Sequence, residues 1–175
     1  MKYRNYLEVF ATIVLLSLAG QFKIPVPGID VPITLQSMMV ILLPIVFDWK
    51  NSSLGVGLFL IAACLGAPIL SGGAGGFDTV TGSSFGFLTA FLIVNLITGL
   101  ILPLQKGPRL IFLFILFITQ HILIMISGLS WIALATDSIV TWSDYVAPFL
   151  PGLIIKSVMG SGLAEIAIRT GLSKQ

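Results

Sequence analysis

Six long apolar segments dominate this 175-residue chain, and they constrain its fold more than any other feature. Apolar runs of about 20 residues are long enough to cross a lipid bilayer. Only 9% of the residues are charged, whereas soluble domains average about 25%. The sequence therefore predicts an all-α membrane protein with six transmembrane helices. We expect them at Tyr6–Phe22, Ile33–Phe47, Leu54–Ala67, Phe85–Leu102, Leu110–Leu129 and Pro148–Arg169.

The basic residues are distributed unevenly between the two sides of this predicted bundle. With a cytoplasmic N-terminus, the cytoplasmic side receives Lys2, Arg4, Lys50, Lys106, Arg109, Arg169 and Lys174. Lys23 falls on the outer side and Lys156 within the membrane. Cytoplasmic loops carry such an excess of Lys and Arg, so we expect both termini to be cytoplasmic in a multi-pass protein of the plasma (inner) membrane. No basic cluster indicates nucleic-acid binding.

Lys156 lies about halfway along the apolar stretch from Ala147 to Ala167. A lone cation at the centre of a membrane helix costs roughly 2.5–3.5 kcal/mol on insertion scales. Nothing nearby neutralises it, because Glu165 is too far along the helix and Leu153 occupies the position one turn earlier. The simplest missing partner is an anionic ligand. The alternative is a structural lysine that snorkels or bonds to backbone carbonyls of neighbouring helices.

The connections expected on the outer side are longer and more unusual than the cytoplasmic ones. The first, Lys23–Pro32, contains three prolines and is predicted to be a stiff, non-helical connector. The second, Ala67–Ser84, contains a glycine-rich run that either closes its bare backbone over a ligand or serves as a flexible connector. The third, Ser130–Ala147, is rich in aromatic residues, as interfacial segments are. This pattern favours capture of a molecule from outside.

Other polar residues at membrane depth have more ordinary explanations. Asn95, Gln120 and His121 are expected to bond across helices more often than to contact a ligand. Glu165 and Arg169, four positions apart, are expected to pair. The last predicted helix also carries a stripe of small residues suited to close packing, namely Ser157, Gly160, Ser161 and Ala164. No spacing indicates a catalytic set, a metal site or a nucleotide-binding loop, so we expect no catalytic residue, metal or cofactor.

Four motifs in sequence order resemble the BioY family, the biotin-binding membrane subunits of energy-coupling-factor (ECF) transporters. The segment VPITLQ (31–36) resembles the family's opening of the second helix. The segment GAPILSGGAGG (66–76) resembles Gly-Leu-Pro-Val followed by Gly-Gly-x-Gly-Gly. The segment GSSFGFL (82–88) occupies the place of Gly-Pro-Thr-x-Gly-Tyr-Leu. The segment PFLPGLIIK (148–156) resembles Pro-Phe-x-Pro-Gly-Asp-x-x-Lys.

The resemblance implies an ECF substrate-subunit bundle of six helices, in which residues 1–175 form a single integral-membrane substrate-binding domain. It implies an outward-facing pocket and transport by binding and reorientation. The implied partners are biotin or a related small carboxylate, the lipid bilayer, an ECF transmembrane coupling protein and ATPase subunits. The chain itself carries no ATPase motif.

Carried over by motif, Lys156 would meet the charged or polar end of the ligand, and the glycine loop would cap it. Three positions depart from the family pattern: Leu153 replaces an acidic residue, Ala74 replaces the Asn of some members, and Phe87 replaces Tyr. Polar contacts could then come from Ser84, Asn95 or the loop backbone. The predicted substrate-binding residues are Lys156, Thr34, Gln36, Gly72, Gly73, Ala74, Gly75, Gly76, Ser84, Phe87, Leu153 and Asn95.

Two alternatives remain open at this point. The same bundle could serve a different small carboxylate or vitamin precursor, because losing a polar partner in a buried site costs about 1–3 kcal/mol. A small non-transport membrane enzyme or assembly factor that uses His121 is the second alternative.

Overall fold

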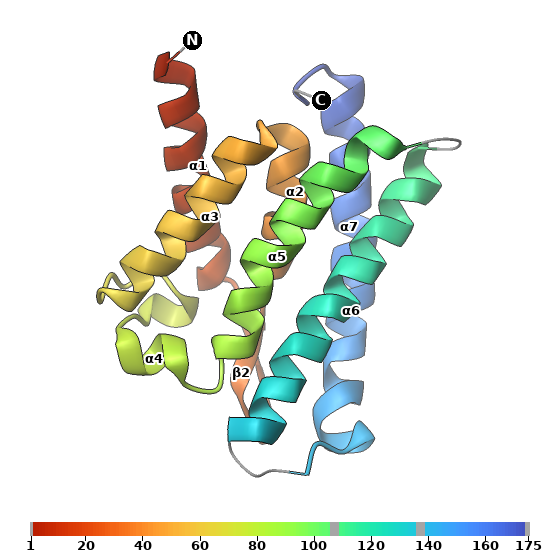
Figure 1. Cartoon of the computed structure of the whole chain (residues 1–175). Coiled ribbons are helices and arrows are strands. Elements are labelled where there is room, and N and C mark those ends of the chain that lie inside the picture. Colours follow the sequence, from red (N-terminus) through yellow and green to blue (C-terminus); the bar gives the residue numbers. More distant parts are fainter. Residues whose placement is uncertain (1, 106–108, 136–138, 174–175) are drawn as a thin grey trace.

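The chain folds into a bundle of helices that run along the long direction of the molecule (Figure 1). The computed structural model describes residues 2–105, 109–135 and 139–173. In those ranges, six main helices correspond to the six predicted segments. They are α1 (Lys2–Gln21), α2 (Gln36–Val46), α3 (Trp49–Cys64), α5 (Phe85–Ile101), α6 (Arg109–Ala135) and α7 (Leu150–Arg169). A 3₁₀ turn, η1 (Ser71–Gly73), and a short helix, α4 (Phe77–Thr81), connect α3 to α5.

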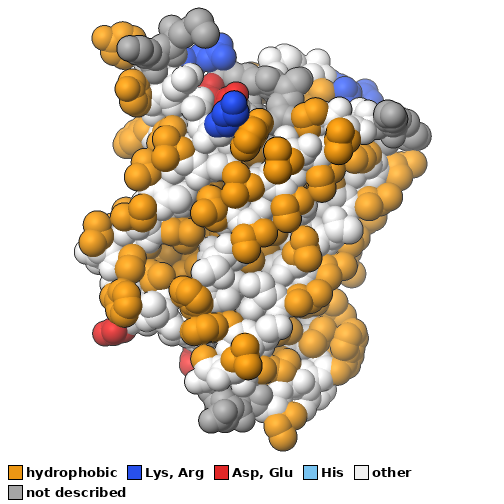
Figure 2. All heavy atoms as spheres, viewed as in Figure 1, with side chains coloured by type: hydrophobic (Ala, Val, Ile, Leu, Met, Phe, Trp, Pro, Cys, Tyr) orange, Lys and Arg blue, Asp and Glu red, His pale blue; other side chains and the backbone are white. Residues whose placement is uncertain are grey.

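The surface of the bundle is that of a membrane protein. Large hydrophobic side chains cover the face seen in Figure 2 and are exposed along α1, α3, α5, α6 and α7. Within the described residues, three helical segments are long and apolar enough to cross a membrane: Phe85–Leu104, Arg109–Ala135 and Trp142–Arg169. Length and composition alone thus support three of the six predicted spans.

Helix α2 is short because it lies inside the bundle. Its 11 residues rise about 17 Å at 1.5 Å per residue, roughly half of the ~30 Å of bilayer hydrocarbon. Residues 40–45 are buried without a break, and the helix contacts α1, α3, α5, α6 and α7. Because its neighbours shield it from lipid, α2 needs neither a polar face nor the full bilayer length.

A β hairpin connects α1 to the start of α2. Its antiparallel strands are β1 (Lys23–Val26) and β2 (Ile29–Thr34), joined by a turn in which Gly28 has φ 77°. The segment is non-helical, as predicted, but it forms a paired hairpin within a mostly helical fold. The helical start expected at Ile33 is wrong, because α2 begins at Gln36. A two-stranded hairpin leaves one edge of each strand unpaired, so it tolerates prolines that a central strand would not.

The third outer connection also differs from the prediction. Helix α6 continues through Ser130 to Ala135, so the connection is shorter than Ser130–Ala147. A π-helical turn at Trp142–Val146 and a 3₁₀ turn at Ala147–Phe149 lead into α7. Residues 106 and 174, expected to be cytoplasmic lysines, lie outside the described ranges.

Charged side chains join α6 to α7 at one end of the bundle. The Glu165 carboxylate lies 2.6 Å from Nε of Arg169, which confirms the predicted pair. It also lies 2.7 Å from Nε of Arg109 on α6, a contact that sequence spacing did not indicate. The start of α1 and the end of α7 lie at this same end, where Lys and Arg side chains gather (Figures 1 and 2).

The small-residue stripe of α7 is a packing surface, as predicted. Ser157, Ser161 and Ala164 are buried. A Cβ atom on Gly160 would overlap the ring of Phe117, which is 0% exposed and has no room to withdraw.

We therefore expect Gly160→Ala to lower the Tm of the purified protein by several degrees, because overpacking a core costs about 1–3 kcal/mol. Gly162→Ala is the matched control. A Cβ there meets nothing within 4 Å, and alanine is favoured over glycine in helices by about 0.8–1.0 kcal/mol. Thermal unfolding in detergent measures both variants. Equal Tm values would contradict close α6–α7 packing at Gly160.

Candidate functional site

A cavity of about 270 Å³ lies between the hairpin, the start of α2 and the facing sides of α5, α6 and α7. It is located toward the end of the bundle opposite the start of α1, where β2 is seen in Figure 1. Its volume is close to the lower limit of small-molecule pockets, about 300–1,000 Å³. The cavity has room because α2 is short. This helix begins only at Gln36, which lies beside the cavity.

The Lys156 side chain reaches from α7 across the cavity to the start of α2. Its Nζ donates to Oγ of Ser37 at 2.6 Å and to the carbonyl oxygen of Thr34 at 3.3 Å. Both acceptors are neutral, and no ion pair joins Lys156 to a carboxylate within the described ranges. An ammonium group has three donors. The lysine is thus fixed by two bonds, while its charge and its third N–H remain available to a ligand.

His121 on α6 lines the same cavity and is only 4% exposed. Its Nδ1 lies 2.8 Å from the carbonyl oxygen of Phe117 and 3.1 Å from Oγ of Ser157. Nε2 is buried and has no partner in the part of the chain that the structure describes. Oγ of Ser71, which also lines the cavity, is likewise buried and unpartnered. Buried polar atoms are rarely left unpaired, so both atoms point to a polar ligand.

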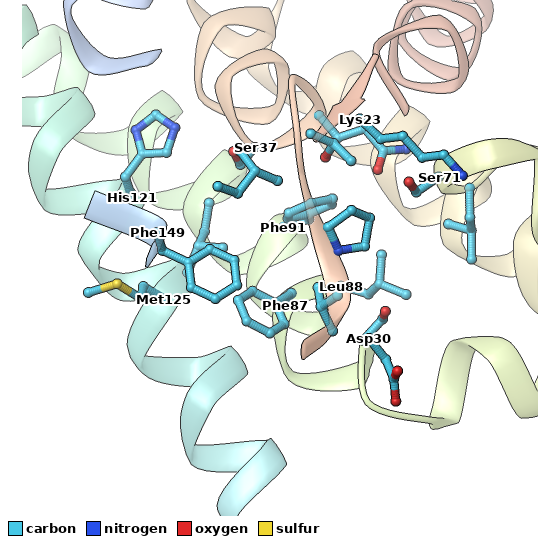
Figure 3. Close-up of a pocket in the computed structure, with 18 of the residues that line it drawn as sticks. Lys23, Asp30, Ser37, Ser71, Phe87, Leu88, Phe91, His121, Met125 and Phe149 are labelled. Carbon is cyan, nitrogen blue, oxygen red and sulfur yellow. The ribbon is translucent and has the colours of Figure 1, made fainter. Parts of the chain in front are cut away.

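Aromatic side chains form the apolar part of the cavity. Figure 3 shows Phe87, Phe91 and Phe149 between His121 on one side and Lys23 and Ser71 on the other. The ring centroids of Phe87 and Phe149 are 5.9 Å apart. The cavity therefore offers polar groups at two sides and an apolar wall between them, an arrangement suited to a small molecule with two polar ends.

Seven of the predicted substrate-binding residues line this cavity: Lys156, Thr34, Gln36, Ala74, Ser84, Phe87 and Leu153. Gln36 also has a structural bond, since its Nε2 donates to the carbonyl oxygen of Leu16 on α1 at 3.1 Å. Gly72, Gly73, Gly75 and Gly76 are not among the lining residues, and their contact with a ligand stays a prediction. Ser71 and Ala74 contribute to the lining instead.

Asn95 does not line the cavity either. Its Nδ2 donates to the carbonyl oxygen of Val40 at 2.8 Å and to Oγ of Ser52 at 3.0 Å. Its Oδ1 accepts a bond of 2.8 Å from Ser53. Asn95 is 0% exposed and joins α5 to α2 and α3. Its side chain therefore stabilises the packing of α5 against α2 and α3.

Three further lining residues, Lys23, Asp30 and His121, were not among the predicted site residues. Lys23 was expected in an outer connector, but β1 carries its side chain over the backbone of Gly72 and into the cavity lining. Hairpin pairing brings Asp30 to the same lining. Both placements depend on contacts between distant segments, which no local pattern indicated.

Comparison with known proteins shows the family of this chain. The model of the BioY family matches residues 1–173. The chain belongs to the BioY family. Its relatives include the biotin transporter BioY2 of Lactococcus lactis, 32% identical over 142 residues that cover 78% of this chain and 76% of that protein. The biotin transporter BioY of Rhodobacter capsulatus is 32% identical over 145 residues, covering 75% of this chain and 76% of that protein.

The fold is also that of a solved structure. The 2.1 Å crystal structure of the S-component for biotin from an ECF-type ABC transporter superposes with a TM-score of 0.84. The match covers 96% of this chain and 92% of that chain at 24% sequence identity. The shared fold therefore extends over nearly the whole chain.

The role of Asn95 in this BioY chain can be tested by Asn95→Leu. We expect a fall in Tm that corresponds to about 1–3 kcal/mol, because the variant leaves the buried carbonyl of Val40 and two serine hydroxyls without their partner. Ser84→Ala is the control, since Ser84 lines the cavity and lies only partly buried. Thermal unfolding of both variants measures the difference. A Tm for Asn95→Leu equal to that of the parent would show that the network is dispensable.

Proposed function

We propose that this chain is the membrane-embedded substrate-binding subunit of a biotin uptake system. The observation that carries the proposal is the cavity-lining ammonium of Lys156, which neutral oxygens hold without a compensating carboxylate. The relatives named as biotin transporters supply the ligand class. Biotin matches the cavity chemically: it has a carboxylate, a ureido group with donors and an acceptor, and an apolar body that suits the phenylalanine wall.

The proposed topology has six membrane spans, two cytoplasmic termini and a single domain over residues 1–175 in the plasma membrane. Arg4, Lys50, Arg109 and Arg169 lie in segments that begin or end at the same end of the bundle. An excess of Lys and Arg marks the cytoplasmic side. Asp30 and Asp78 lie toward the other end, together with the cavity. The cavity therefore opens toward the outside in this topology.

The proposed mechanism is capture followed by transport with an ATP-driven partner module. The hairpin and the turn at Ser71–Ala74 contribute to the cavity lining and are the segments that would admit and then cover the ligand. The sequence carries no nucleotide-binding motif, so the energy comes from other chains. An ECF transmembrane coupling protein and its ATPase subunits are the partners consistent with the solved structure of this fold.

The geometry gives less support to an enzyme that uses His121. A catalytic imidazole is normally oriented by a carboxylate and aimed at a nucleophile or substrate atom. Here Nδ1 is oriented by a backbone carbonyl and a serine hydroxyl. No group of three or more potential metal ligands occurs among residues 2–105, 109–135 and 139–173. Transport of a related carboxylate is the alternative that the experiments below address.

Replacing Lys156 with methionine tests the proposal. The variant keeps the length of the side chain but removes the charge and its hydrogen bonds. Hydrogen bonds to charged groups are worth about 1.5–3 kcal/mol, so we expect the Kd for biotin in isothermal titration to rise ten-fold or more. The Tm without ligand should stay near that of the parent, because a desolvated charge is also removed. Lys50→Met, an exposed lysine outside the cavity, should bind biotin normally.

Unchanged affinity of Lys156→Met would make this lysine structural and remove the basis of the proposed site. Titration of the parent with biotin, dethiobiotin and lipoate separates the two transport alternatives. A ligand raises stability by RT ln(1 + [L]/Kd). A Tm shift with another carboxylate but none with saturating biotin would favour the alternative substrate.

A further inference from the structure

The structure assigns a second ligand-binding residue, His121, which nothing in the motifs indicates. We propose that its Nε2 atom accepts a hydrogen bond from a ureido N–H of the bound ligand. This inference deepens the proposed function and rests on it. It gives the histidine a role in specificity, not in chemistry.

The hydrogen bonds of the ring decide which nitrogen can accept. Nδ1 lies 2.8 Å from the carbonyl oxygen of Phe117, and a carbonyl can only accept. The ring proton is therefore assigned to Nδ1. In the neutral imidazole, Nε2 is then an acceptor with a free lone pair. The neutral form is the one that suits this cavity, because Lys156 already supplies its positive charge.

Nε2 lacks any partner that the folded chain could provide. The residue is 4% exposed, and Nε2 is buried without a hydrogen bond in the described ranges. Ser157, the one hydroxyl bonded to the ring, is engaged at Nδ1 on the opposite side. Because Nε2 is already shielded from water in the unliganded chain, a bond to a ligand donor there replaces no bond to solvent. A ligand that presents a donor to Nε2 therefore gains a hydrogen bond that the described residues of the folded chain do not supply.

The chemistry of biotin leaves a single kind of group for that position. Its carboxylate and thioether have no N–H or O–H to give at neutral pH, whereas its ureido ring has two N–H donors and one carbonyl acceptor. Lys156 lines the same cavity with an unused N–H. His121 and Lys156 thus line one cavity as an acceptor and a donor, the two kinds of group that a ureido ring can bond.

This arrangement also accounts for the apolar residue at position 153. Leu153 is buried on α7 one turn before Lys156 and offers no acceptor. The acceptor for the ureido donors is instead supplied from α6, across the α6–α7 contact. The chain therefore keeps a complementary pair of polar groups while it places one of them on a different helix.

The test uses two variants and three ligands. His121→Phe keeps a ring but removes the acceptor, whereas His121→Gln keeps an acceptor near the position of Nε2. We expect His121→Phe to weaken biotin and dethiobiotin, which both carry the ureido ring, by about ten-fold or more. Lipoate, which keeps the carboxylate but lacks the ureido group, should be affected less than about two-fold. His121→Gln should recover part of the loss.

Gln120→Leu is the matched control on the same helix. Gln120 is 2% exposed and has a buried unpartnered Oε1, but it does not line the cavity. It should leave the affinity for all three ligands unchanged. A similar loss of biotin affinity in Gln120→Leu, or equal losses for biotin and lipoate in His121→Phe, would show that His121 acts through the fold and would overturn the inference.

Nuclear magnetic resonance gives a reading that needs no substitution. The chain has a single histidine, so ¹⁵N-histidine labelling reports on this ring alone. Biotin should shift the Nε2 resonance and leave the Nδ1-protonated tautomer in place, whereas lipoate should not. Biotin binding with an unmoved Nε2 resonance overturns the inference but leaves the proposed function standing. Failure of the parent protein to bind biotin removes the proposed function, and the inference with it.

Discussion

The bonds from Lys156 to the start of α2 are the contacts on which the rest of the site depends. They join residues 119 and 122 positions apart in the chain and connect α7 to the junction of β2 and α2. That junction borders the cavity because α2 is short. Its length is roughly half the thickness of the bilayer hydrocarbon. An α2 that began earlier in the chain would fill the cavity. Without Lys156, the carbonyl oxygen of Thr34 and the hydroxyl of Ser37 would lose their bonds to Nζ. The short α2 thus leaves space for the cavity, and the long side chain of Lys156 supplies polar contacts to the start of that helix.

Polar groups in the bundle fall into two classes that differ in how well they are satisfied. Asn95 makes three hydrogen bonds, and Glu165 is bonded to two arginines. Both tie helices together. Around the cavity, by contrast, Nε2 of His121 and Oγ of Ser71 are buried without partners. Within the described residues, unpartnered buried atoms also occur away from the cavity, at Thr98 and Gln120. Buried polar groups are costly unless paired, and of these four only the unpartnered groups of Ser71 and His121 belong to residues that line the cavity, where a ligand can pair them.

The sequence predicted what depends on composition and local pattern. Apolar runs predicted six helices, and spacing predicted the Glu165–Arg169 pair. The lone charge of Lys156 within an apolar segment predicted a ligand-binding residue, and Lys156 lines the cavity. The hairpin could not be anticipated, since strand pairing joins residues whose prolines indicated only a stiff connector. The partner of Glu165 on α6 and the position of His121 depend on how α6 and α7 pack, a relation between distant segments. The sequence could not show that Asn95 bonds to α2 and α3, because an isolated polar residue looks the same whether it binds a helix or a ligand.

Leu153, which stands where the resembled motif has an acidic residue, affects the electrostatics of the site as well as its hydrogen bonds. An acid one turn before Lys156 would pair with it and leave that part of the cavity neutral. With Leu153, the charged groups lining the cavity are two lysines, Lys23 and Lys156, and one aspartate, Asp30. The positive charge of Lys156 is then met by dipoles alone, which stabilise a cation less than a carboxylate does. A ligand that brings a negative charge gains from this imbalance, whereas a neutral ligand gains only the hydrogen bonds. The substitution that weakens one motif therefore increases the preference of the same cavity for an anion.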